Sequence, residues 1–107
     1  MNSDTLLFEG REIHTLTFSR STGAISTDID NETVILDISA GLYSNLDHVG
    51  TTIWNILEKP STFRQILDRT VAEYDVSPAE CSRDLITFLK ELYENNLLIV
   101  QSSNEPE

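Results

Sequence analysis

The feature that most constrains the fold of this chain is a single change of pattern near Asp47. Before it, short runs of β-branched and aromatic residues stand between turn-forming residues, a pattern typical of strands. After it, apolar residues recur at helical spacing between clear start and stop signals. A chain of 107 residues suits one domain, since domains usually run to about 100–150 residues. The sequence therefore predicts one α+β domain, with a small sheet first and helices second.

The first half predicts a three-stranded antiparallel sheet. Residues 33–38 form the clearest strand, flanked by weaker ones at 24–29 and 42–46. Asp30-Asn31 and Ser39-Ala40-Gly41 supply turn residues between them. Because two tight turns join three consecutive strands, we expect a meander in which residues 42–46 lie at an edge. Residues 13–18 could form a further strand or an extended arm.

The second half predicts three helices with explicit caps. The start signals are Asp47 for the first helix, Thr62 with Gln65 for the second, and Ser77 with Pro78 for the third. Pro60 ends the first helix, and Asn95-Asn96 can close the third because Asn accepts a left-handed conformation. Gly50 inside the first helix costs about 1 kcal/mol against alanine, which indicates close packing there. Three strands followed by three helices predict a winged-helix-turn-helix-like arrangement.

The sequence predicts a tail at each end of the chain. Residues 1–12 show no convincing period and are expected to form a flexible N-terminal tail. Residues 101–107 are polar and are expected to be a disordered C-terminal tail. The predicted domain therefore spans residues 13–100.

The charge of the chain disfavours several classes of partner. Seven Lys and Arg residues stand against 18 Asp and Glu residues, a formal net charge of −11. Nucleic acid and anionic membrane surfaces both require a basic face. No apolar run approaches the roughly 20 residues that span a bilayer, and the N-terminus lacks the pattern of a secretory signal. We expect a cytoplasmic protein that binds neither nucleic acid nor membrane.

The sequence contains no set of residues typical of catalysis or of a cofactor site. A single cysteine, Cys81, excludes an internal disulfide and a multi-cysteine metal site. His14 and His48 lack metal-ligand spacing, and Cys81 lies on an apolar helix face that favours burial. No nucleophile elbow and no glycine-rich phosphate loop are present. We therefore expect no enzyme activity, no metal and no cofactor.

What remains is a binding module. A peptide can pair with the open edge of residues 42–46 through main-chain hydrogen bonds, and the third helix would form the opposite wall. The inward stripe predicted for that helix consists of Leu85, Phe88, Leu89 and Leu92. Beside this stripe lies a mixed apolar and basic surface: Arg83, Ile86, Thr87, Lys90 and Tyr93. The alternative, which the residues leave open, is that Ile86 and Tyr93 complete the core while Arg83 and Lys90 pair with nearby acids.

Residues 24–100 resemble the PqqD-like family, the peptide-recognition domains of ribosomal peptide maturation. The motif residues that match are Leu36, Asp37, Gly41, Tyr43, Leu46, Gly50, Ile53, Trp54 and Leu57. Asp47 stands where Asn is usual, which keeps the capping, and Ser44 stands where a second aromatic is common. The pattern is closer to relatives from lasso-peptide and other maturation clusters than to the protein of pyrroloquinoline quinone synthesis.

The resemblance implies a non-catalytic chaperone for a precursor peptide. Its leader segment would add as an antiparallel strand beside residues 42–46 and be clamped by the third helix. The implied contact residues are Leu42, Tyr43, Ser44, Asn45, Leu46, Arg83, Ile86, Thr87, Lys90 and Tyr93. Arg83 and Lys90 would attract acidic leader residues.

The implied partner enzyme is a leader peptidase with a cyclase in the lasso branch, and a radical enzyme in others. Two other interpretations of the chain stay open. It could be a structural subunit, or it could be a winged-helix regulator that binds no peptide.

Overall fold

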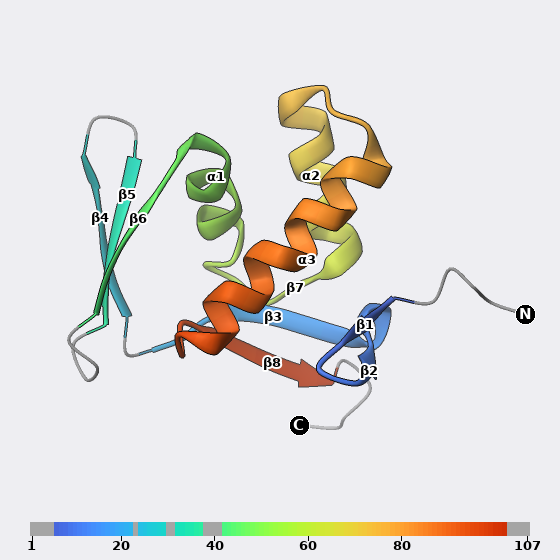
Figure 1. Cartoon of the computed structure of the whole chain (residues 1–107), viewed down its shortest axis with the longest axis horizontal. Coiled ribbons are helices and arrows are strands. Elements are labelled where there is room, and N and C mark those ends of the chain that lie inside the picture. Colours follow the sequence, from blue (N-terminus) through green and yellow to red (C-terminus); the bar gives the residue numbers. More distant parts are fainter. Residues whose placement is uncertain (1–5, 23, 30–31, 38–41, 103–107) are drawn as a thin grey trace, which may run out of the picture.

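The sheet expected in the first half is present as an antiparallel meander of β4 (Ala24–Ile29), β5 (Glu32–Asp37) and β6 (Leu42–Leu46) (Figure 1). The computed structural model describes residues 6–22, 24–29, 32–37 and 42–102. The predicted turns at residues 30–31 and 39–41 lie outside these ranges. In the central strand β5, Thr33 stands opposite Asp28 of β4 and Leu46 of β6. Among the described residues, β6 pairs with β5 alone, so its outer side is a sheet edge.

The three helices also lie where the capping signals place them: α1 (His48–Ile56), α2 (Phe63–Tyr74) and α3 (Pro78–Glu94). The Asp47 carboxylate accepts a hydrogen bond from the Gly50 amide at 2.8 Å, and Thr62 forms a reciprocal capping box with Gln65. Ser77 accepts from the Glu80 amide at 3.1 Å. The α+β class, with a three-stranded antiparallel sheet and three helices, is confirmed. None of these helices is long and apolar enough to cross a membrane, as far as the described residues go.

A second sheet, which the sequence pattern does not reveal, joins distant parts of the chain. It has the order β7 (Ser61–Thr62), β3 (Leu16–Arg20) and β8 (Leu98–Ser102). The predicted strand at residues 13–18 is divided, because residues Ile13–Thr15 form a 3-10 turn (η1) before β3 begins. Figure 1 shows β3 and β8 side by side beneath α3. β3 and β8 come from opposite ends of the chain and β7 from its middle, and no local pattern specifies such pairings.

The expectation of a flexible tail over residues 1–12 is wrong for residues 7–12. Residues 7–12 form a small hairpin of β1 (Leu7–Phe8) and β2 (Arg11–Glu12), with Gly10 at a φ of 80°. Phe8 is fully buried, and its ring meets Phe18 edge-on at 5.3 Å between centroids. Burial of this one aromatic ring explains why the segment is ordered. At the other end β8 runs to Ser102, so residues 101 and 102 belong to the sheet; residues 1–5 and 103–107 lie outside the described ranges.

Trp54 of α1 connects the helix to both sheets. It is 1% exposed, and its indole N–H donates to the Ser26 hydroxyl of β4 at 3.0 Å. Arg20 of β3 lies over the indole ring at 4.8 Å and donates to the Trp54 carbonyl at 2.8 Å. The ring therefore provides apolar burial, a cation–π contact and a hydrogen bond at the junction of β3, β4 and α1.

We expect Trp54→Ala to lower the free energy of unfolding by about 3–5 kcal/mol, the usual range for removing a buried large aromatic side chain. Urea unfolding followed by far-UV circular dichroism measures this loss. Trp54→Phe is the matched control, because it keeps an aromatic ring and removes the indole N–H. A loss below about 1 kcal/mol for the alanine variant would contradict the central role of the ring.

Candidate functional site

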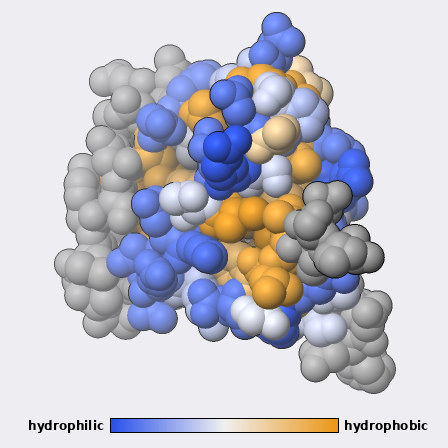
Figure 2. All heavy atoms as spheres, turned by 45° about the vertical axis from the view of Figure 1, so that its right-hand side comes forward, coloured by the Kyte–Doolittle hydropathy of each residue, from blue (hydrophilic) through white to orange (hydrophobic). Residues whose placement is uncertain are grey.

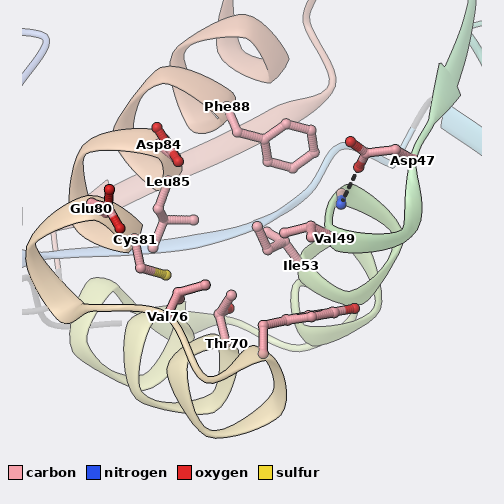
Figure 3. A pocket seen from close by; sticks show the side chains of 12 residues that line it. Asp47, Val49, Ile53, Thr70, Val76, Glu80, Cys81, Asp84, Leu85 and Phe88 are labelled. Carbon is pink, nitrogen blue, oxygen red and sulfur yellow. Dashed lines mark hydrogen bonds between the residues drawn. The ribbon is translucent and has the colours of Figure 1, made fainter.

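A cavity of about 410 Å³ lies between the three helices, at the point where β6 ends and α1 begins (Figure 3). Such a volume falls in the range of about 300–1,000 Å³ that ligand pockets occupy. The side chains around it are Asp47, Val49, Gly50, Ile53, Thr70, Tyr74, Val76, Glu80, Cys81, Asp84, Leu85 and Phe88. We call this cavity the interhelical pocket.

Gly50 explains how α3 comes so close to the end of β6. A β-carbon at this position would lie 3.3 Å from the Asp47 carboxylate, 3.4 Å from Cβ of Leu46 and 3.4 Å from a ring carbon of Phe88. The edge of the Phe88 ring therefore packs against the α1 backbone directly beside the last residue of β6. The close packing that the sequence indicates at Gly50 is confirmed. It places the pocket at the C-terminal end of the edge strand, with α3 as its far wall.

The pocket has apolar walls and an acidic rim. Ile53, Leu85 and Phe88 point into it, while the carboxylates of Asp84 and Asp47 stand at its opposite sides (Figure 3). Val49 of α1 lines the pocket and is 40% exposed. Part of the apolar face of α1 therefore lines this pocket, and the rest of that face packs into the core.

The polar side chains at the floor of the pocket, Thr70 and Tyr74, each form hydrogen bonds within the protein. The buried Thr70 hydroxyl donates to the Ile66 carbonyl at 2.8 Å. The Tyr74 hydroxyl shares a hydrogen bond with Thr52 and donates to the His48 carbonyl at 3.2 Å. The Thr70 bond lies within α2, and the two Tyr74 bonds tie the C-terminal end of α2 to α1.

Cys81 lies at the base of the pocket, with its thiol pointing inward (Figure 3). Burial raises the pKa of this thiol, and the nearby Asp84 carboxylate raises it further. Because the thiolate is the reactive form, the group is kept as a neutral, poorly nucleophilic thiol. His14 and His48 pack separately, against Phe63 and Tyr74. Across the described ranges, no three His, Cys, Asp or Glu side chains gather in a way that could hold a metal ion.

The β6 residues singled out by the sequence, Leu42, Tyr43, Ser44, Asn45 and Leu46, do form the edge strand. Leu46 is 8% exposed and belongs to the core. The side chains of residues 42–45 lie outside the described part of the structure. The backbone register across to β5 is described, with Ile35 opposite Ser44 and Val34 opposite Asn45.

The five predicted residues of α3 do not lie at the pocket. Arg83, Thr87 and Lys90 are exposed, and the Thr87 hydroxyl donates to the Arg83 carbonyl. At 100° per residue, Ile86 and Tyr93 share a flank of α3 that is turned about 170° from the flank of Asp84 and Phe88. Ile86 packs partly against the core, and the Tyr93 ring contacts Phe8 of the N-terminal hairpin at 5.8 Å.

The two flanks of α3 thus have different surroundings. The flank of Asp84 and Phe88 faces α1 and the end of β6. The flank of Ile86 and Tyr93 faces the β1–β2 hairpin, where Leu7 is 55% exposed. Figure 2 turns that side of the molecule forward and shows hydrophobic residues gathered below the centre of the face, bordered by hydrophilic ones.

Sequence reasoning placed Phe88 inward but did not connect it with Gly50, because only the fold brings these two positions together.

We expect Cys81 to be alkylated more slowly in the folded chain than in the chain unfolded in urea, and the half-maximal rate to occur at higher pH. The reason is the raised pKa, since the thiolate fraction at a given pH is smaller. Iodoacetamide labelling followed by mass spectrometry between pH 7 and pH 10 measures this. Asp84→Asn should move the folded profile to lower pH, with Glu94→Gln as the matched control. Identical profiles for the folded and unfolded chains would contradict the assignment.

The family model and the solved structures that match this chain point to the same family. Residues 32–98 match the family model for coenzyme PQQ synthesis protein D (PqqD). TbiB1, solved in complex with the TbiA(beta) leader peptide, is 35% identical, with a TM-score of 0.71 and coverage of 83% of this chain and 99% of its own. A comparison with curated proteins finds no significant match.

Two more distant structures share the fold. Lasso peptide synthetase B1, complexed with the leader peptide, is 22% identical, with a TM-score of 0.69 and coverage of 77% of this chain and 96% of its own. The PqqD part of Methylobacterium extorquens PqqCD, a stand-alone recognition element for ribosomally synthesized and post-translationally modified peptides, is 18% identical. Its TM-score is 0.66, and the match covers 92% of this chain and 99% of that one.

Proposed function

The chain belongs to the PqqD family, and from this membership we propose that it binds the leader segment of a ribosomally made precursor peptide and presents it to maturation enzymes. As a member of this family the chain is a recognition element and not an enzyme, in agreement with its sequence. The observation that carries the proposal is the outer edge of β6, which pairs with no other described strand and ends at the pocket beside α3.

Strand addition suits this edge for a physical reason. An edge strand presents unpaired N–H and C=O groups, and an extended peptide satisfies them while its side chains enter neighbouring pockets. The β4–β5–β6 meander holds β6 in a defined register, so the hydrogen-bonding groups are fixed before the peptide arrives. The relative that is 35% identical, TbiB1, was solved with a leader peptide, which supports the same role here.

In this proposal, β6 supplies the backbone contacts and α3 supplies the wall. Asp84 and Phe88 on the pocket flank of α3 join the set predicted from sequence. Ile86 and Tyr93, together with the exposed Arg83, Thr87 and Lys90, lie on other faces of the helix. They would meet parts of the precursor that extend past the strand, or the partner enzyme. The lasso-type role, with a leader peptidase and a cyclase as partners, is the more specific form of the proposal.

We expect the purified chain to bind the leader of a precursor peptide encoded beside its gene with a dissociation constant in the micromolar range or below. Fluorescence anisotropy of the labelled leader gives the affinity, and amide shifts of the ¹⁵N-labelled protein give the location. Shifts should concentrate at β6 and α3. Absence of binding by a folded chain would contradict the proposed function and favour a purely structural subunit.

A proline scan tests strand addition itself. Successive residues of an edge strand present their N–H groups alternately to the neighbouring strand and to the open side. Of Ser44→Pro and Asn45→Pro, the substitution at the outward N–H should abolish leader binding with little change in the unfolding midpoint. The other should weaken the ladder with β5 and lower the midpoint. Full-strength binding by both variants would show that the edge of β6 is not the binding element.

A further inference from the structure

We propose that the interhelical pocket selects a lysine or arginine in the leader peptide, at a position just N-terminal to the segment that pairs with β6. This inference rests on the proposed function and makes it more specific, because it names the charge of the side chain that the pocket takes. It also gives the side chain a place in the peptide relative to the paired segment.

The direction of the peptide follows from the direction of β6. A peptide that pairs antiparallel to β6 has its N-terminal end beside Leu46 and its C-terminal end beside Leu42. The pocket opens at the Leu46 end, because Leu46, Gly50 and Phe88 meet there. A residue that precedes the paired segment is therefore the one that reaches the pocket.

The charge of the rim determines which side chain is favoured. Three carboxylates line the pocket, from Asp47, Glu80 and Asp84, and its lining contains no lysine or arginine. Glu80 and Asp84 are four residues apart on α3 and so lie on one face of the helix. Asp47 stands across the opening from them (Figure 3). An acidic side chain placed here would be repelled by three carboxylates from two sides of the opening.

The walls suit the long stem of a cationic side chain. Lysine and arginine bury their methylene groups against apolar surface while the charged head stays near carboxylates and water. Val49 and Phe88 provide that apolar surface, and the Phe88 ring adds a favourable site for a nearby cation. The basic residues Arg83 and Lys90 lie away from this flank on exposed faces of α3, so they leave the rim acidic.

The experiment uses the neighbouring precursor's leader in three versions that differ at this position, with Lys, Leu or Glu. We expect the Lys peptide to bind about fivefold more tightly than the Leu peptide in low salt, since partly exposed ion pairs contribute up to about that much. The Glu peptide should bind more weakly than the Leu peptide. High salt should reduce the differences. Amide shifts of Val49 and Cys81 should distinguish the Lys complex from the Leu complex.

Protein variants assign the preference to the pocket. Asp84→Asn and Glu80→Gln should each reduce the advantage of the Lys peptide, and Asp84→Lys should reduce it further. Glu94→Gln removes the same charge from an exposed position on α3 outside the pocket lining and should change nothing. Urea unfolding of each variant verifies that the fold is intact.

The outcomes separate the two proposals. Equal affinities for the three peptides, with shifts still at β6, would overturn the charge selection and leave strand addition in place. A preference for Lys that persists in the Asp84 and Glu80 variants would overturn the assignment to this pocket. Failure of every peptide to bind would overturn the proposed function itself.

Discussion

The packing of the Trp54 indole against both sheets is the interaction on which the relative positions of the sheets and α1 depend. Only Asp47 separates Leu46 from the first residue of α1, so the orientation of α1 also determines where the end of β6 lies. Trp54 fixes that orientation through its hydrogen bond to Ser26 of β4 and its contacts with Arg20 of β3. Because both sheets and the first helix meet at one buried ring, the edge of β6 is held at a set position relative to α3.

Local signals predicted the parts of this fold that local interactions determine. Asp47, Thr62 and Ser77 each cap a helix through the hydrogen bond that their side-chain type and position indicate. Asn96 adopts a φ of 63°, the left-handed conformation expected after α3. The meander is likewise local, since each strand pairs with the next one along the chain.

The parts that sequence reasoning missed depend on contacts between distant residues. β3 pairs with β7 and β8, about 45 and 80 residues later in the chain, and Phe8 is buried against Phe18 and Tyr93. The pocket has the same origin, because Gly50 and Phe88 lie on different helices. Helical spacing identified Phe88 as inward-facing, but it could not show that the Asp84 and Phe88 flank of α3 lies beside the end of β6.

The acidic charge of the chain affects what can pair with the outer edge of β6. An uncovered strand edge favours pairing with further copies of the same chain, which leads to aggregation. A net charge of −11 opposes that association, because every copy repels every other. The same charge also opposes acidic peptides, so an edge protected in this way is used most readily by a ligand that brings positive charge to it. A carboxylate rim at the end of β6 concentrates that selection at one position of the peptide, where backbone pairing alone would accept almost any sequence.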